Sequence, residues 1–206
     1  AVSYDKGFVL FGGIEAGLRM NSVHKFNAME GKWQYFDCGD FEPAPRSYHA
    51  SAVHGKYMFV QGGECTDLWQ DNRENDQTRN VCMGDSIAMS TFHQSKHITH
   101  SAGVHGSPAM GATLVCKDDM YMLDLETQRW KEIKSSLSPL PRKGHSLTTV
   151  TLKSSGGDKR DYLLLFGGLS PDTDAVGNSV HICKVDDLVT KGRCSWRLLT
   201  CTGDAP

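Results

Sequence analysis

The chain has 206 residues, of which 39% are hydrophobic and 22% are charged, and its formal net charge is -2. This balance is typical of a globular protein, and it offers no positive field that would hold a nucleic acid or an anionic membrane surface. No apolar run reaches the length of a membrane span, and the first residues lack the pattern of a signal peptide. Seven cysteines without a CxxC pair, and no Asn-x-Ser/Thr acceptor, favour the cytoplasm or the nucleus.

Three apolar runs along the chain each lead into a pair of glycines: "GFVLFGG" from Gly7, "KYMFVQGG" from Lys56 and "DYLLLFGG" from Asp161. Two of them follow a Pro-x-Pro-Arg-x-x-His segment, "PAPRSYH" from Pro43 and "PLPRKGH" from Pro139. Each is followed by an alternating run that ends at a tryptophan. Features that recur in register indicate a repeat, here a unit of four short strands.

The apolar runs predict central strands that are buried on both faces. We expect the glycine pairs to end these strands, because the chain must turn where a β-carbon would clash. No stretch shows a sustained helical period. The recurrence predicts a structural role for Gly12, Gly13, Trp33, Arg46, His49, Gly62, Gly63, Trp130, Arg142, His145, Gly167, Gly168 and Trp196.

Recurrence also argues against catalysis, because a catalytic group is needed once whereas a structural group is needed in every unit. We therefore expect the Arg-x-x-His pairs to form hydrogen bonds between units, and the tryptophans to be core residues and not platforms for a stacked ligand. The chain has no phosphate-cradling glycine loop, no G-x-S-x-G elbow and no H-E-x-x-H motif.

The double glycine, the Pro-Arg-x-x-His segment and the "DLETQRW" that ends at Trp130 closely resemble the kelch-repeat family. The resemblance implies an all-β fold: a kelch-type β-propeller segment of about three four-stranded antiparallel blades. These cover residues 1–41, 42–136 and 137–200, and residues 201–206 would begin the next blade. Both ends fall inside a repeat and the count gives eleven strands, so we expect part of a larger propeller, six-bladed or similar.

The middle unit is longer than the others. From the second glycine to the tryptophan it takes 67 residues, against 20 and 28 in the first and third units. We interpret residues 64–118 as a long insertion between strands two and three of the middle blade. The alternative is a degenerate blade, with "GDSIAMSTF" as a third strand and "PAMGATLV" as the first strand of a new blade.

Binding residues are expected where the units differ, because long loops on a rigid scaffold carry function. In kelch-like propellers the loops between strands two and three, with those between blades, form a partner-binding face. Transferred to this chain, that face includes Arg19, Trp69, Arg73, Arg79, Asp172 and Asp174. His93, His97 and His100 would share one face of a helix, but their spacing matches no established zinc motif, so we expect no metal and no cofactor.

These observations predict a non-catalytic protein-protein interaction module, and the resemblance to the kelch-repeat family implies a role as an adaptor, substrate receptor or scaffold. The alternative is the propeller domain of an enzyme. That enzyme would be similar to a copper-radical oxidase, or would carry a phosphatase or another catalytic domain outside these residues.

Overall fold

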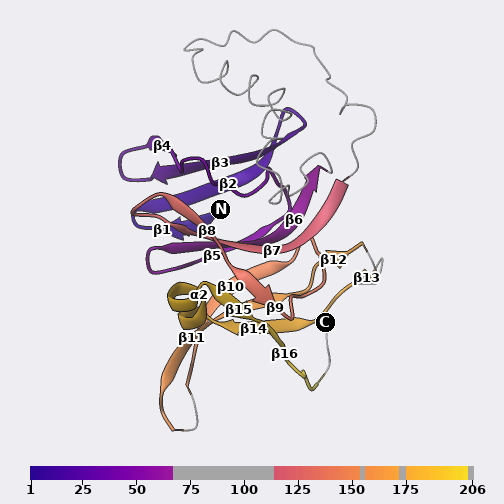
Figure 1. The fold of residues 1–206 in the computed structure, drawn as a ribbon. Coiled ribbons are helices and arrows are strands. Elements are labelled where there is room, and N and C mark those ends of the chain that lie inside the picture. Colours follow the sequence, from indigo (N-terminus) through magenta and orange to yellow (C-terminus); the bar gives the residue numbers. More distant parts are fainter. Residues whose placement is uncertain (67–113, 154–155, 172–174, 204–206) are drawn as a thin grey trace.

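The computed structural model describes residues 1–66, 114–153, 156–171 and 175–203. Within these ranges the chain is almost entirely β, and three four-stranded antiparallel sheets follow one another in chain order (Figure 1). We call these sheets blades 1, 2 and 3. In each blade the strands pair in the order in which they occur along the chain.

The blades have closely similar strand plans. Blade 1 consists of β1 (Val2–Tyr4), β2 (Gly7–Glu15), β3 (Leu18–Asn27) and β4 (Lys32–Phe36). Blade 2 consists of β5 (Ala50–His54), β6 (Tyr57–Thr66), β7 (Leu114–Asp124) and β8 (Arg129–Glu132). Blade 3 consists of β10 (Ser146–Lys153), β11 (Lys159–Phe166), β14 (Val180–Lys184) and β16 (Arg197–Leu198). The expected all-β architecture of four-stranded blades is confirmed, and the described residues form three of them. The count of eleven strands is wrong for these blades, because β1 already provides a first strand for blade 1.

Each blade has two faces, because successive side chains of a strand point to opposite sides of the sheet. We call the face toward the preceding blade the upstream face and the other one the downstream face. Blade 2 packs its upstream face on the downstream face of blade 1 in one apolar cluster that contains Val9, Phe11, Val23, Phe36, Met58, Val60, Tyr121, Leu123 and Trp130. Blade 3 packs in the same way on blade 2, in a cluster that contains Phe59, Met120, Met122, Leu147, Leu163, Leu165, Cys183 and Trp196. The core therefore lies between the blades.

The glycine pairs behave differently from the prediction. Strands β2 and β6 run through Gly12-Gly13 and Gly62-Gly63 with a register shift at each pair, so the pairs form bulges and do not end the strands. Only Gly167-Gly168 follows the end of its strand. The steric reason holds nonetheless: a β-carbon on Gly63, where φ is 93°, would lie 2.7 Å from the Ser47 carbonyl oxygen.

A short helix, α2 (Val185–Lys191), interrupts blade 3 after β14, contrary to the expectation of strands and turns alone. Val185 and Leu188 are buried in the cluster between blades 2 and 3. Asp187 and Lys191 form an ion pair one turn apart, and Gly192 ends the helix in a left-handed conformation. Burial of two apolar side chains and a favourable C-terminus together stabilise a helix of only seven residues.

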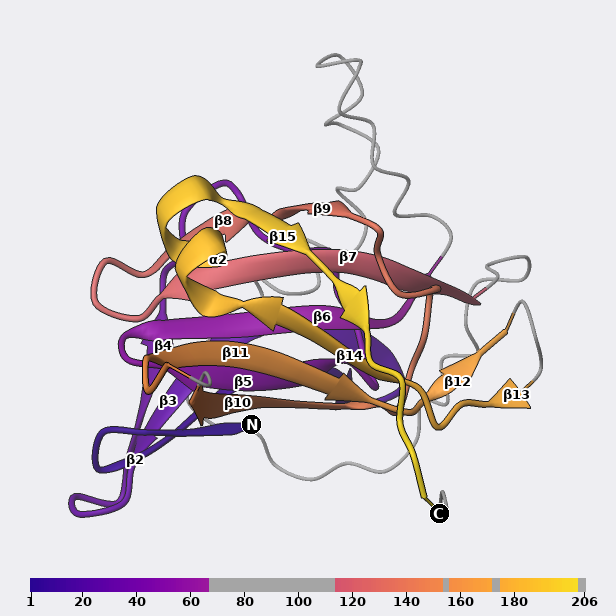
Figure 2. The ribbon, with the colours of Figure 1, turned by 90° about the horizontal axis from the view of Figure 1, so that it is seen from below.

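Two smaller sheets lie outside the blades. Strand β9 (Lys134–Ser136) follows blade 2 and pairs in parallel with β15 (Arg193–Ser195) of the blade 3 segment, along the edge that also carries α2 (Figure 2). Strands β12 (Leu169–Ser170) and β13 (Ala175–Val176) form a hairpin after the third glycine pair. The parallel pair links blades 2 and 3 through backbone hydrogen bonds in addition to their apolar contact.

Both ends of residues 64–118, the stretch interpreted as an insertion, lie in strands. Strands β6 and β7 are neighbours in blade 2, and their pairing extends to Thr66 and Leu114, so residues 64–66 and 114–118 belong to strands. The alternative, in which "PAMGATLV" begins a new blade, is wrong for Leu114 and Val115, because both lie in the third strand of blade 2. Residues 67–113 lie outside the described part of the chain.

Candidate functional site: an ionic cluster where three blades meet

Two buried arginines occupy the junctions between blades. The Arg46 guanidinium donates to both carboxylate oxygens of Asp119, at 2.6 and 2.9 Å, and to the carbonyl oxygens of Ala44 and Gly62. All of these partners belong to blade 2 or to the segment that leads into it. Burial lowers the pKa of Arg46, but the hydrogen bonds and charge of Asp119 more than offset this effect, so the group stays charged.

The contacts that cross between blades come from the backbone of the arginine and from the histidine. At the first junction Gly13 N donates to the Arg46 carbonyl, and Arg46 N donates to the Met20 carbonyl. The same pair of bonds forms at the second junction, where Gly63 N donates to the Arg142 carbonyl and Arg142 N donates to the Lys117 carbonyl. We expected the Arg-x-x-His side chains to bond between blades, whereas the guanidinium groups bond within their own blade.

The histidine rings do reach the preceding blade. His49 lies with its ring centroid 5.1 Å from that of Phe11 in blade 1. Burial, with a smaller contribution from the Arg46 charge, lowers the pKa of His49 to about 3. Burial likewise lowers the pKa of His145 to about 4. Both imidazoles are therefore neutral at pH 7, which suits a buried position and does not suit a proton-transfer group at that pH.

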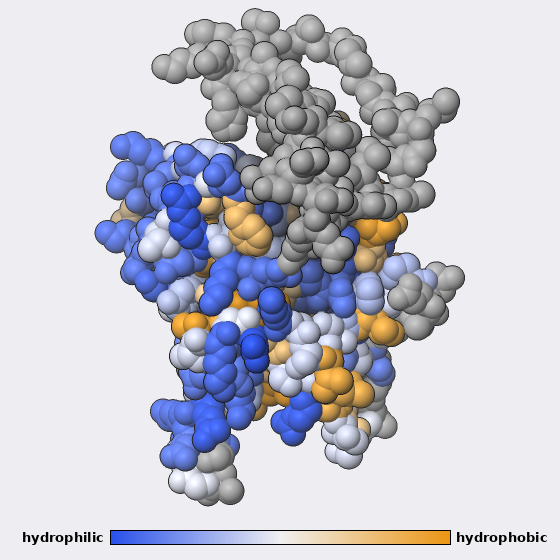
Figure 3. All heavy atoms as spheres, viewed as in Figure 1, coloured by the Kyte–Doolittle hydropathy of each residue, from blue (hydrophilic) through white to orange (hydrophobic). Residues whose placement is uncertain are grey.

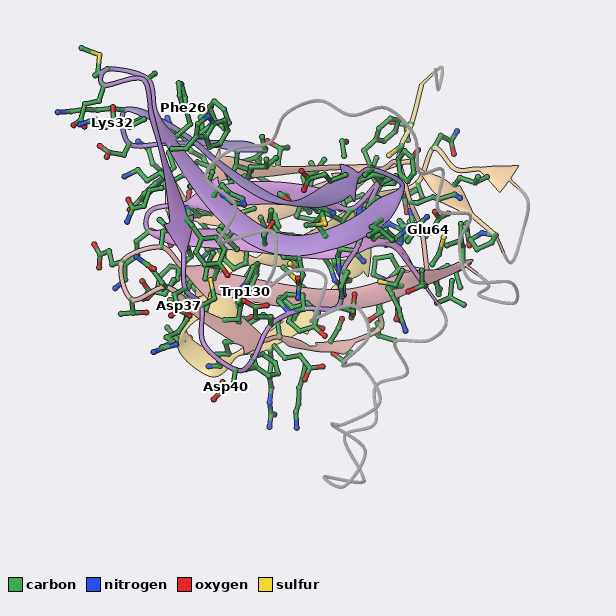
Figure 4. The ribbon with its side chains drawn as sticks, turned by 90° about the horizontal axis from the view of Figure 1, so that it is seen from above. Phe26, Lys32, Asp37, Asp40, Glu64 and Trp130 are labelled. Atoms are coloured by element: carbon green, nitrogen blue, oxygen red, sulfur yellow. The ribbon has the colours of Figure 1, made fainter. Side chains whose placement is uncertain are left out.

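An ionic cluster joins one side chain from each blade at one end of the sheets. The Glu64 carboxylate of β6 is buried between Arg19 of β3 and Lys143, which precedes β10, and forms an ion pair with each. Arg19 Nε also donates to the Glu64 carbonyl oxygen at 3.1 Å. Figure 4 shows Glu64 at the opposite end of the sheets from Lys32 and Asp40. Two cations share one carboxylate, so the cluster carries a net positive charge.

The contacts within the cluster also shift the pKa values of Glu64 and Lys143. Burial raises the pKa of Glu64, but hydrogen bonds from Lys143 and Arg19 outweigh burial, so the pKa lies below its usual value. The hydrogen bond to Glu64 raises the pKa of Lys143. Glu64 and Lys143 are therefore charged at neutral pH, and the arrangement suits electrostatic recognition.

A hollow of about 620 Å³ lies over this cluster, and it is lined by Ile14, Arg19, Tyr48, Glu64, Leu114, Lys143, Gly144, Gly168 and Leu169. Ile14, Tyr48 and Leu114 are each more than half exposed. In Figure 3 hydrophobic atoms appear on the side of the molecule where β7 begins. Apolar side chains around a few convergent charges are typical of a ligand or peptide site.

Tyr48 has a strained backbone at the rim of this hollow. Its φ is 56°, a left-handed conformation that costs a residue with a β-carbon about 1–2 kcal/mol. The equivalent position in blade 3 is Gly144, which adopts φ 65° without that cost. An exposed tyrosine held in a conformation that suits glycine is a candidate functional residue.

Only part of the predicted site falls on described residues. Arg19 lies in the ionic cluster, whereas Trp69, Arg73, Arg79, Asp172, Asp174, His93, His97 and His100 lie outside the described residues. Sequence reasoning missed Glu64, Lys143 and Tyr48. A signal was available for Glu64, because the residue after each glycine pair is Ile14, Glu64 or Leu169, and charge appears at that repeat position once.

The described residues contain no group of three or more histidine, cysteine or acidic side chains that could hold a metal ion. Within the same ranges no helix is both long and apolar enough to cross a bilayer.

The chain is similar to proteins that carry kelch domains. It is 27% identical to Host cell factor 2 of Homo sapiens, over 85% of this chain and 25% of that protein. It is 23% identical to Kelch domain-containing protein 2 of Bos taurus, over 89% of this chain and 51% of that protein. This is a kelch-type propeller fold. The chain spans about half the length of such relatives, or less, and no family model matches it.

The chain is similar in fold to the solved structure of YjhT. That structure matches 98% of this chain and 51% of its own, with a TM-score of 0.55 and 20% identity. Together with the curated relatives, this likeness confirms the kelch-type propeller that the repeat residues predicted.

Proposed function

We propose that this kelch-type propeller segment is a non-catalytic protein-binding module, and that its partner docks over the Arg19–Glu64–Lys143 cluster. The observation that carries the proposal is the convergence of three blades on one hollow, with a positively charged centre and an apolar rim. Each blade contributes a residue that breaks the repeat at that place. Residues that depart from a structural repeat are free to serve a partner and not the fold.

The physical character of the hollow favours a protein or peptide partner. Burying Tyr48, Ile14 and Leu114 under a partner would remove apolar surface from water, at about 25 cal/mol per Å². A tyrosine with restricted backbone loses little conformational entropy on binding, and aromatic residues of this kind often dominate interfaces. The charges beneath would fix the orientation of the partner.

A role as an adaptor, substrate receptor or scaffold fits this site equally well, because a fold does not choose among such roles. Kelch-domain relatives support protein interaction in general, and the enzymatic alternative is not favoured by them. Cys38, Cys65, Cys183 and Cys194 are buried thiols, which supports a place in the cytoplasm or the nucleus.

The test is affinity capture with Tyr48→Gly and Arg19→Ala as site variants. Tyr48→Gly removes the aromatic ring and relieves the backbone, so we expect the fold to persist while partners are lost. Gln128→Gly is the matched control, because Gln128 has φ 57° in the turn between β7 and β8 of blade 2. Lys25→Ala is the control for charge, since Lys25 pairs with Asp5 of blade 1 and does not line the hollow.

We expect mass spectrometry to find a set of proteins that wild type and both controls retain and both site variants lose. The same set bound by all five proteins would contradict the proposed docking surface.

A further inference from the structure

Blade 3 carries a segment that the other two blades lack. Short turns join the third and fourth strands of blades 1 and 2, whereas residues 185–196, with α2 and β15, separate β14 from β16 in blade 3. Strand β15 pairs with β9, which follows blade 2, and the two form a small parallel sheet along the edge that carries α2 (Figure 2). The exposed side of a segment that departs from the repeat is free to serve a partner.

The two faces of this small sheet differ in character. On the inner face Ser135 stands opposite Cys194, which is 1% exposed and belongs to the core between blades 2 and 3. Because side chains alternate along a strand, the pairs on either side of these two residues turn outward. These pairs are Lys134 with Arg193 and Ser136 with Ser195, and all four residues are exposed. The outer face therefore presents two cations beside two hydroxyl groups.

A third cation, Lys131 of β8, lies beside this face. A β-carbon on Gly192 would lie 2.7 Å from Lys131 Nζ, so the ammonium group is placed directly over Gly192. Gly192 precedes Arg193, and its carbonyl oxygen accepts a hydrogen bond from Lys134 N at 3.2 Å. Lys131, Lys134 and Arg193 are therefore neighbours, although they come from two blades.

Among the described residues, none of these three cations forms an ion pair. Asp187, a carboxylate of α2, is bound by Lys191. The C-terminus of a helix attracts a cation, and Lys191 and Lys131 occupy that place. It does not account for Lys134 and Arg193, because like charges directly opposite each other in a sheet are destabilising. This cost to the fold indicates a function that uses both charges.

We propose that the outer face of the β9–β15 sheet is an oxyanion site, and that it binds a phosphorylated serine or threonine of a partner protein. Lys131, Lys134, Arg193 and Ser195 all present hydrogen-bond donors, and a phosphate group offers three acceptor oxygens. A guanidinium group can bind phosphate through two parallel hydrogen bonds. A carboxylate carries one negative charge and would neutralise the three cations less completely than a phosphate dianion does.

The size of the cluster favours a single phosphate group over a larger polyanion. A nucleic acid or an anionic membrane requires a broad positive field, whereas this chain has a formal net charge of -2. None of the cluster residues lines the hollow over Glu64. The oxyanion site is therefore a second contact surface, and it does not depend on the first.

The first experiment locates the site by NMR. The probe is an acetylated Gly-Ala-phosphoserine-Ala-Gly peptide, titrated into the isotope-labelled 206-residue chain. We expect saturable shifts at the amides of Lys134, Gly192 and Arg193, with a dissociation constant of about 1 mM or below. The unphosphorylated peptide should cause no such shifts. Equal shifts with both peptides, or shifts confined to other parts of the chain, would overturn the proposal.

Charge reversal tests the cations against a matched control. Lys134→Glu should weaken phosphopeptide binding by about tenfold or more, because it places a negative charge against the phosphate. Lys159→Glu is the control, since Lys159 stands opposite Lys153 in the β10–β11 hairpin, and the substitution changes the net charge equally. This variant should bind like wild type. Equal weakening by the two variants would contradict the site, and circular dichroism checks that both are folded.

A conservative variant tests the assigned contact without a change in charge. Arg193→Lys keeps the cation but removes the planar pair of donors, so we expect weaker binding of the phosphopeptide. Ser195→Ala should weaken binding by a smaller factor, since it removes one hydroxyl donor. Full affinity in Arg193→Lys would contradict the contact between the guanidinium group and phosphate.

Two further probes test the class of ligand. A peptide with glutamate in place of phosphoserine should bind more weakly, and vesicles of phosphatidylcholine with phosphatidylserine should not sediment with the chain. Vesicle binding that Lys134→Glu abolishes, without binding of the phosphopeptide, would overturn the proposal in favour of a membrane surface. Tyr48→Gly should bind the phosphopeptide like wild type, because Tyr48 lines the other surface, so the two proposals can fail separately.

Discussion

Trp33 and Trp130 occupy the same place in two blades, near the start of the fourth strand, yet one is exposed and the other is buried. Both have aromatic neighbours, so the difference does not come from side-chain type. Trp130 has the downstream face of blade 1 against it, and Trp33 has no described blade against it. In a stacked repeat, then, the repeat residue makes a surface and the neighbouring repeat decides whether that surface becomes core.

Truncating the two tryptophans should give the largest contrast. Trp130→Ala leaves a cavity between two blades, so we expect the free energy of unfolding to fall by about 3–5 kcal/mol. Trp33→Ala removes contacts within one sheet only and should cost about 1 kcal/mol, as for contacts of an exposed aromatic pair. Denaturant unfolding measures both losses. Equal losses of stability in the two variants would show that the contribution of the tryptophan comes from its own blade and not from the neighbouring blade.

The two arginines allow a second contrast at a repeat position. Arg46 has the Asp119 carboxylate, whereas Arg142 bonds to Gly167 O and Ser179 Oγ and has no carboxylate partner among the described residues. Asp119→Asn leaves a buried guanidinium without its counter-charge and should cost about 3 kcal/mol. Ser179→Ala removes one hydrogen bond from the charged guanidinium and should cost about 1.5 kcal/mol. Thermal unfolding at pH 7 compares them, and a larger loss at Ser179 would reverse the comparison.

The second glycines of blades 1 and 2 differ only in what lies beside them. A β-carbon on Gly63, where φ is 93°, would meet Ser47 and His49, whereas one on Gly13, where φ is 103°, would have no described heavy atom within 4 Å. Alanine at either position strains the backbone by about 1–2 kcal/mol. At Gly63 it also overpacks the bulge, which should add about 1–3 kcal/mol. Chemical denaturation of the two alanine variants measures the difference. Equal losses of stability would mean that the backbone at the Gly63 bulge moves aside for the β-carbon without additional cost.

The smallest predicted effect is a dependence on pH near neutrality. Burial holds the pKa of His49 at about 3 and that of His145 at about 4, below the usual 6.5. The unfolded chain therefore binds protons at these positions before the folded chain does, so stability falls as the pH drops from about 6.5 toward 4 and 3. Between pH 7 and pH 6 the loss should be less than about 1 kcal/mol for each histidine.

The variant His49→Asn should flatten this dependence, because asparagine takes up no proton in that range. Urea unfolding at pH 7, 6 and 5 provides the measurement. A slope unchanged by the substitution would exclude His49 as its source.

The sequence was a good guide to what repeats. Apolar runs, double glycines and tryptophans located the three blades, because strand periodicity and close approach at glycine are local properties of the chain. It was a poorer guide where local signals are weak or compete. Asp186, Asp187, Lys191 and Gly192 are recognisable start and stop signals for α2, but seven residues are too few to show a helical period.

The candidate site was predicted only in part, for a different reason. Arg19 was predicted as a residue of the loop between strands two and three, although it lies at the start of β3. Glu64 and Lys143 are separated from it by 45 and 124 positions in the chain. Nothing local indicates that three such side chains share one hollow. The bulges at Gly12-Gly13 and Gly62-Gly63 were also unexpected, because a bulge depends on which residue of the partner strand stands opposite.

The sequence by itself determined the kind of unit, the places of the three units in the described residues and the residues that these units share. These features depend on alternation, sterics and spacing within a few tens of residues. The tertiary structure decided which faces are covered and which charges meet. A junction exists only where two blades are placed side by side, and Arg19, Glu64 and Lys143 form one cluster only because three blades bring their ends together.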